Sequence, residues 1–169
     1  MADFDISFGI TSKNEGGYTQ DPYETWMGID RAEQPGWDGW SIVDSMRGQS
    51  DFPHCLSANA DLLQSVEDFF RANFWQPVKG DEITDQGVAD KLYDAGVNMG
   101  VPTAIRLMQE ALGLTADGIV GPLTMGAINS ADPADLLSKF KDLRIAHYKQ
   151  IVENHPEDQK YLNAWIARC

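Results

Sequence analysis

The stretch Asn14-Glu15-Gly16-Gly17-Tyr18 separates a short helical pattern before it from a long irregular segment after it. Upstream, Phe4 and Phe8 recur at helical spacing, and Gly16 can adopt the positive φ angle with which many helices end. Glu15 is therefore expected on the last helical turn, where the helix dipole disfavours a negative charge. A carboxylate at a position that lowers the stability of the helix is a candidate for a catalytic role. The plain alternative is a solvated helix end.

Most of the remaining chain has apolar residues at helical spacing, and no segment alternates as a strand does. Residues 19–56 are the exception, because turn-forming residues recur there and leave room only for a short helix near residues 42–46. The sequence therefore predicts an all-α, mainly helical protein with one long irregular loop region. Expected helices cover residues 57–74, 85–98, 103–112, a short piece ending near 129, 132–151 and 157–166. Expected N-caps are Ser57 or Asn59, Thr84, Thr103 and Asp132.

The composition and charge exclude several classes of function. The 169 residues are 43% hydrophobic, which suffices for a folded core. The net charge is −13, with −10 in residues 1–84 and −3 in residues 85–169. The electrostatic field of this negative charge repels phosphate groups and excludes a nucleic-acid partner. It also slows the approach to any anionic polymer at low salt.

The targeting and cysteine patterns are also informative. No apolar run reaches the roughly 18 residues of a membrane span, so no membrane insertion is expected. The first residues lack the basic and then apolar pattern of a signal peptide. The two cysteines, Cys55 and Cys169, are too few for a disulfide framework, and no His/Cys spacing suggests a metal site. Whether the two pair is left open.

Further acids follow Glu15 closely. Asp21, Glu24 and Asp30 lie within fifteen residues of it, and Thr25 follows Glu24 directly. Cleavage of a glycosidic bond uses a proton donor and usually a second carboxylate that activates water or acts as nucleophile. The alternative is a solvated acidic loop, which we prefer for Asp21 and Asp30 taken singly.

The same irregular segment holds three of the five tryptophans, Trp26, Trp37 and Trp40. Tryptophans often fill the underside of loops, and we assign most of the three to packing. Trp26, nearest to the acids, is the candidate for stacking on a sugar ring.

In the helix expected at residues 85–98, a polar row repeats every four residues at Asp90, Asp94 and Asn98. Such a row is usually solvent-exposed. Because small residues lie beside it, Asn98 and Asp94 are also candidates for reaching into a cleft.

Several stretches, in this order, resemble the lysozyme-like glycoside hydrolase family 108. They are Glu15-Gly16-Gly17-Tyr18, Thr25-Trp26-Met27-Gly28-Ile29, Trp37-Asp38-Gly39-Trp40, Asn73-Phe74-Trp75 and Val88-Ala89-Asp90-Lys91-Leu92. Residues 93–129 likewise resemble the family's peptidoglycan-binding half. The resemblance implies N-acetylmuramidases, many of them phage endolysins. It also implies a catalytic part at residues 1–92 and a peptidoglycan-binding part at residues 93–169, packed as one globular unit.

The resemblance assigns roles to individual positions. Glu15 matches the catalytic glutamate that protonates the leaving sugar oxygen, and Tyr18 the tyrosine that shapes the cleft. Glu24 stands where the second acid is expected, and Thr25 where a threonine holds water. The family usually places another acid and a Gly-Gly pair before that threonine, whereas here Glu24 leads straight to it. The substrate-binding candidates are Tyr18, Asp21, Trp26, Asp94 and Asn98.

These observations predict a monomeric, endolysin-type muramidase that needs no cofactor. It would cleave the β-1,4 bond between N-acetylmuramic acid and N-acetylglucosamine, and so lyse bacteria. It would be made in the host cytoplasm without a signal peptide and reach the wall in the periplasm after release through a holin or another route. Two alternatives remain: a lytic transglycosylase that uses Glu15 alone, and a non-hydrolytic peptidoglycan-binding or secretion-associated protein. The identity of the second carboxylate (Glu24, Asp21 or Asp30) and the stereochemical outcome are left open.

Overall fold

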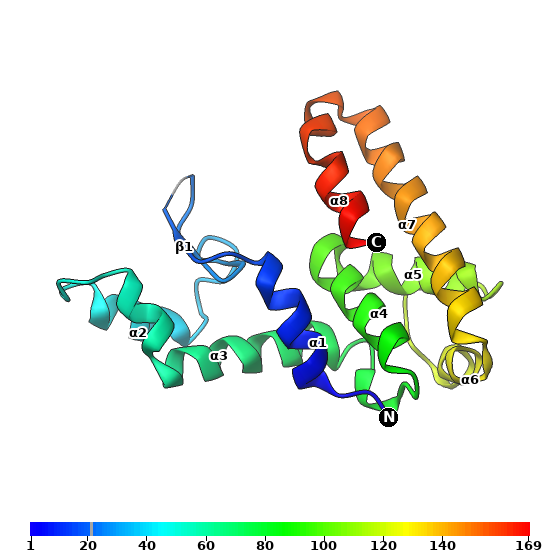
Figure 1. Cartoon of the computed structure of the whole chain (residues 1–169), viewed down its shortest axis with the longest axis horizontal. Helices are drawn as coiled ribbons and strands as arrows, with labels where there is room; N and C mark the ends of the chain where they lie inside the picture. Colours follow the sequence, from blue (N-terminus) through cyan, green and yellow to red (C-terminus); the bar gives the residue numbers. More distant parts are fainter. Residues whose placement is uncertain (21) are drawn as a thin grey trace. The chain divides into compact units, whose positions relative to one another are not determined.

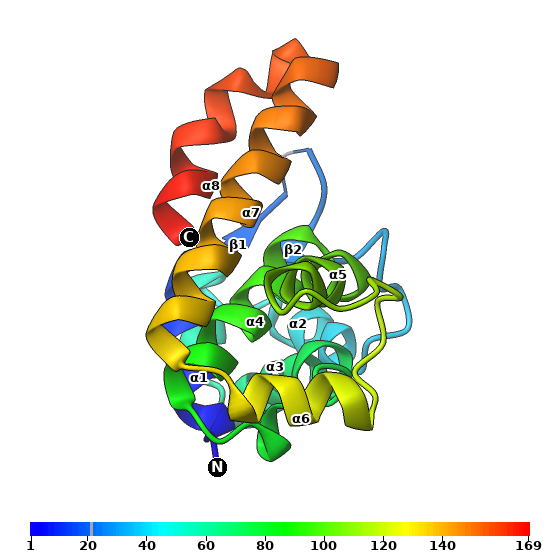
Figure 2. The same ribbon diagram turned by 90° about the vertical axis from the view of Figure 1, so that its right-hand side faces the viewer.

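The computed structural model describes residues 1–20 and 22–169 and is mainly helical, which confirms the predicted fold class (Figures 1 and 2). The α-helices are α1 (Phe4–Thr11), α2 (Gly39–Met46), α3 (Ala60–Phe70), α4 (Gln86–Met99), α5 (Val101–Ala111), α6 (Pro122–Ser130), α7 (Pro133–Asn154) and α8 (Leu162–Arg168). Shorter 3₁₀ turns lie at Ser12–Asn14, His54–Ala58, Gly80–Glu82 and Pro156–Tyr161, and one π-helical turn at Arg71–Trp75.

A small antiparallel sheet lies in the segment that the sequence left irregular. Its strands are β1 (Tyr18–Thr19), β2 (Thr25–Trp26) and β3 (Ile29–Asp30), in the order β1-β2-β3. Each strand has two residues, too few to show the alternation by which a strand is predicted. Met27 and Gly28 join β2 to β3, and both have positive φ angles, 45° and 80°. Two such residues are typical of the tight hairpin turn whose twist matches its strands.

The chain divides into two compact units. The first, called here the hairpin unit, is Phe8–Asn73; the second, called the helical unit, is Met1–Ser7 together with Phe74–Cys169. The boundary predicted between residues 92 and 93 falls inside α4. The assignment of separate functions to the two sides of that boundary stays a prediction.

Two of the expected helix caps are confirmed. The Asn59 side chain accepts a hydrogen bond from the backbone N–H of Leu62 at 2.8 Å and begins α3. The Asp132 side chain accepts one from Asp135 at 2.9 Å, with Pro133 as the first residue of α7. In both helices a short polar side chain satisfies a backbone donor that the helix itself leaves unpaired.

Two other expected caps are wrong. The side chain that caps α4 belongs to Asp85, at 2.9 Å from its backbone donor, and not to Thr84. Helix α5 begins at Val101, with Pro102 in its first turn, so Thr103 lies inside the helix and does not cap it. The cap of α4 lies one residue after the predicted position, whereas Gly100, the N-cap residue of α5, lies three residues before Thr103.

The core of the helical unit includes three aromatic rings from distant parts of the sequence. Phe4, Trp75 and Tyr93 pack edge-to-face with centroid separations of 5.7, 5.8 and 5.9 Å. Gly80 permits this arrangement, because a Cβ there would lie 2.3 Å from the Trp75 indole. The indole N–H donates to Asp81 at 2.9 Å. These contacts attach the first turn of α1 to the helical unit.

The compact turn expected at residues 117–124 is confirmed, and a buried glutamine fixes it. The Gln109 amide donates to Asp117 Oδ1 at 2.7 Å, to the Ile119 carbonyl at 3.1 Å and to Thr124 Oγ1 at 3.1 Å. Its oxygen accepts the backbone N–H of Gly118 at 2.9 Å. One side chain thus satisfies four polar groups of the turn, which explains why a glutamine is tolerated in the core. In the described part of the chain, no helix is long and apolar enough to cross a membrane.

Candidate active site

Glu15 lies where helix α1 and its 3₁₀ extension end. Its backbone N–H donates to Ser12 at 3.1 Å and its side chain is partly buried. Gly16 follows with a φ of 71°, as the sequence predicted for the end of this helix. The chain then enters β1, so the helix end directs Glu15 toward the small sheet.

The Glu15 carboxyl lies against the turn between β2 and β3. A Cβ at Gly28 would be 2.6 Å from Glu15 Oε2, 3.2 Å from its Cβ and 3.4 Å from its Cδ. Gly28 also has a φ of 80°, which side-chain-bearing residues rarely adopt. Glycine at this position therefore serves the hairpin turn and the close approach of the carboxyl together. The structure brings Glu15 beside the hairpin that carries Thr25 and Trp26.

Glu24 lies in a charged cluster within the hairpin unit. Its Oε1 accepts the Tyr18 hydroxyl at 2.9 Å and an Arg47 N–H, and its Oε2 accepts Arg31 Nη1 at 3.0 Å. Both arginines also bind Asp44, Arg31 through two bonds of 2.8 and 2.6 Å and Arg47 through one of 2.9 Å. The Glu24 side chain is 17% exposed, so it is largely enclosed by these partners.

These partners fix the ionisation of the cluster. Burial by itself would raise the pKa of Glu24, but hydrogen bonds from Tyr18, Arg47 and Arg31 outweigh it and lower the pKa. The pKa of Asp44 is lowered by its hydrogen bonds with both arginines. Burial and the bond to Glu24 raise the pKa of Tyr18. Glu24 is therefore a firmly ionised carboxylate with both oxygens engaged.

The other predicted residues of this unit have distinct surroundings. Thr25 is partly exposed at the start of β2, with its hydroxyl 3.5 Å from the Tyr23 carbonyl. Trp26 is 3% exposed, and its indole N–H has no hydrogen-bond partner among the described residues. Asp30 accepts the N–H groups of the two residues after Arg31, at 2.7 and 3.3 Å, and so caps a turn. Asp21 lies outside the described residues.

Asp94 and Asn98 belong to the helical unit, and both are engaged within it. Asp94 is 6% exposed and binds Arg144 at 3.1 Å and Arg168 at 2.9 Å. The Asn98 side-chain oxygen accepts the Tyr148 hydroxyl. The polar row of α4 therefore faces other helices of its unit, and its usual interpretation as a solvent-exposed face is wrong at these positions. The substrate-binding role of Asp94 and Asn98 stays a prediction.

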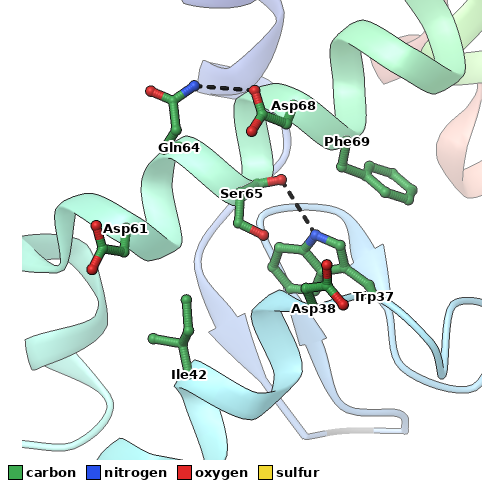
Figure 3. Close-up of a pocket in the computed structure, with 8 residues that line it drawn as sticks. All are labelled: Trp37, Asp38, Ile42, Asp61, Gln64, Ser65, Asp68 and Phe69. Carbon is green, nitrogen blue, oxygen red and sulfur yellow. Dashed lines mark hydrogen bonds between the residues drawn. The ribbon is translucent and has the colours of Figure 1, made fainter.

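A cavity of about 370 Å³ opens between α2 and α3 of the hairpin unit (Figure 3). Its apolar wall is formed by Trp37, Ile42 and Phe69. Its polar lining is Asp38, Asp61, Gln64, Ser65 and Asp68. None of the described residues predicted to act in catalysis lines it.

Sequence reasoning missed three parts of this arrangement. The hairpin turn at Gly28 carried a local signal, a glycine between the β-prone residues Thr25-Trp26 and Ile29. Arg31 and Arg47 carried none, because the cluster includes side chains as far as 23 residues apart, Glu24 and Arg47, and forms only when the chain folds. The cavity beside Trp37 likewise depends on two helices packing together.

Two family models match the chain. The model described as "Glycosyl hydrolase 108" covers residues 8–100, and the one described as "Predicted Peptidoglycan domain" covers residues 103–169. The chain is also similar to a solved structure titled "Structure of Brucella abortus SagA", with a TM-score of 0.65 and 23% sequence identity over 98% of this chain and 92% of that one. At that identity the likeness concerns the fold alone. No curated protein matches the chain.

A mainly helical chain that joins a glycosidase region to a peptidoglycan region defines a class of enzyme, the peptidoglycan hydrolases. The chain belongs to glycosyl hydrolase family 108. The resemblance noted in the sequence is thereby confirmed, and the protein is a glycoside hydrolase whose substrate is peptidoglycan.

Proposed function

We propose that this enzyme is an N-acetylmuramidase of the endolysin type, with Glu15 as its general acid. The observation that carries the proposal is the position of the Glu15 carboxyl against the Gly28 turn, so close that a Cβ at Gly28 would lie 2.6 Å from Glu15 Oε2. A catalytic acid needs such fixed placement, because proton transfer depends on hydrogen-bond distance to the leaving oxygen. The substrate bond is the β-1,4 linkage from N-acetylmuramic acid to N-acetylglucosamine.

In this mechanism Glu15 gives its proton to the oxygen of the leaving N-acetylglucosamine as the bond from C1 of the muramic acid breaks. A water then adds to C1, and its proton restores the acid. The Thr25 hydroxyl, partly exposed at the start of β2, holds that water. Tyr18 shapes the cleft and orients Glu24 through their hydrogen bond.

Glu24 contributes to the reaction electrostatically, through its negative charge. A carboxylate with a lowered pKa accepts a proton weakly, so it suits the stabilisation of positive charge on the sugar ring better than removal of a proton from water. Its negative charge is always present at the pH of the cell wall. Arg31 and Arg47 moderate that charge and fix its place.

A second candidate is a lytic transglycosylase. It is favoured by the engagement of both Glu24 oxygens with Tyr18, Arg31 and Arg47, because a transglycosylase needs one acid and no second carboxylate to activate water. In that reaction the 6-hydroxyl of the muramic acid attacks C1 in place of water, and the product is an anhydro sugar.

One experiment separates these functions. Purified peptidoglycan is digested with wild type and Glu15→Gln, and the soluble muropeptides are weighed by mass spectrometry. The proposal expects reducing N-acetylmuramic acid ends from wild type and no products from Glu15→Gln. Anhydromuramic ends would identify the transglycosylase. Full activity of Glu15→Gln would remove Glu15 from the reaction, and binding without any product would indicate a wall-binding protein.

We also propose that the protein is a monomer that acts on the wall from the periplasm after release from the cytoplasm of the cell that makes it. The location is supported by the substrate, because peptidoglycan lies in the periplasm. Expression in a bacterium with and without a phage holin tests it, since lysis should require the holin. Sedimentation of the purified protein tests the monomer.

A further inference from the structure

The cavity between α2 and α3 is a feature that the catalytic mechanism does not use. Its volume of about 370 Å³ falls in the range of small-ligand sites, roughly 300–1,000 Å³. On α3, Asp61, Gln64, Ser65 and Asp68 follow at helical spacing and so share one face. Figure 3 shows these side chains along one wall and Trp37, Asp38 and Ile42 along the other.

Trp37 is held firmly at the edge of this cavity. Its indole N–H donates to the Ser65 carbonyl at 3.3 Å, and its ring packs edge-to-face on Trp40 at 5.1 Å and 89°. A Cβ at Gly39 would lie 2.3 Å from the indole, so the ring rests directly on the start of α2. Trp40 is 3% exposed, whereas Trp37 stays partly exposed in the cavity lining. A rigid aromatic ring in this position suits the apolar C–H face of a sugar.

The polar wall supplies hydrogen-bond acceptors. Asp38, Asp61 and Asp68 are exposed, and the described residues include no cation within ion-pair distance of them. Gln64 donates to Asp68 at 3.1 Å and fixes its carboxylate in the cavity wall (Figure 3). Ionised carboxylates accept hydroxyl and amide hydrogens more strongly than neutral groups do. A sugar ring presents those donors around its edge while its face meets the aromatic ring.

We propose that this cavity is a second carbohydrate site, which binds one N-acetylglucosamine ring of a glycan strand on Trp37 with hydrogen bonds to Asp61 and Asp68. It rests on the proposed function in taking the glycan strand as its ligand. The charge favours a neutral sugar, because three carboxylates repel the lactyl carboxylate of N-acetylmuramic acid wherever no peptide is bonded to it, and accept the neutral ring. A strand held there remains attached to the unit that carries Glu15, which raises the local concentration of cleavable bonds.

The test uses the full chain with Glu15→Gln, so that the ligand survives, and tri-N-acetylglucosamine as the probe. The ¹H–¹⁵N signal of the Trp37 indole, assigned through Trp37→Phe, reports on this cavity alone. The probe should shift that signal in a saturable way, and Asp68→Ala should weaken its affinity about tenfold, the loss of one charge-assisted hydrogen bond. Glu33→Ala, which removes an exposed acid elsewhere on the hairpin unit, is the matched control and should leave the affinity unchanged.

Two further probes decide the specificity. N-acetylmuramic acid at low salt should shift the indole signal far less than the neutral sugar. An equal shift would overturn the role of the carboxylates, and a larger response to free lysine would make the cavity a site for amines. Absence of any shift, or equal affinity in Asp68→Ala, would overturn the site itself. These titrations need no turnover, so they stand apart from the muropeptide digest that tests the proposed function.

Discussion

Replacement of Gly28 by alanine tests the position of the Glu15 carboxyl. The new Cβ would lie 2.6 Å from Glu15 Oε2, whereas ordinary contacts begin near 3.4 Å, so the carboxyl must move by about 0.8 Å. The carboxyl ends a flexible side chain and can move at little cost in stability. The φ of 80° adds a backbone penalty of about 1–2 kcal/mol for a residue with a Cβ. A displacement near 1 Å at a catalytic group lowers the rate by roughly 100-fold.

The assay compares kcat/KM for release of soluble muropeptides with the free energy of unfolding in urea. Gly28→Ala should lose about 1–2 kcal/mol of stability and roughly 100-fold in kcat/KM. Gly113→Ala is the matched control, because Gly113 also has a positive φ, 70°, but nothing lies within 4 Å of its Cβ position. It should lose similar stability and keep its activity. Equal activity of the two variants would refute the claim that Gly28 positions the acid.

Three further outcomes are expected. Because the folded-state pKa of Glu24 is lowered from 4.5, its bonds stabilise the protein above that pH and lose this effect as the pH falls through the lowered value. Arg47→Ala should therefore destabilise the protein at neutral pH, with a difference in urea unfolding that shrinks on acidification; a difference independent of pH would contradict this. Asp94→Asn leaves the buried Arg144 short of its counter-charge and should cost about 3–5 kcal/mol in unfolding free energy, and an unchanged midpoint would show that the pair is not structural. Moderate salt should speed the lysis of cell walls by screening the net charge of −13, and rates that fall steadily from low salt upward would count against that field.

The helices were predictable because their signals are local. Asn59 and Asp132 cap α3 and α7 as expected, since a short polar side chain followed by an apolar periodic run carries its own information. Thr84 was predicted to cap α4, but Asp85 is the capping residue. Both residue types can cap a helix, and only the folded chain shows that Thr84 binds Asn129 instead. The three strands could not be predicted, because two residues cannot show a period of two.

The candidate site was predictable in part. Glu15 was found through its conflict with the helix dipole, and Gly16 adopts the positive φ that its position required. The surroundings of Glu24 were not foreseen, because they depend on Arg47, which reaches it from the C-terminal end of α2. Trp26 is the candidate for stacking on a sugar, and that role stays a prediction, whereas the lining of the cavity by Trp37 depends on the packing of α2 against α3 and could not be foreseen.

By itself, the sequence determined the helical class, the end of the first helix at Glu15 and the resemblance to a glycosidase family. These properties follow from residue spacing and backbone preference, which act over a few positions. The tertiary structure decided which charges meet at Glu24, which carboxyl lies over Gly28 and which tryptophan faces a cavity. Those outcomes depend on distances between side chains far apart in the sequence, and such distances are set only when the elements pack.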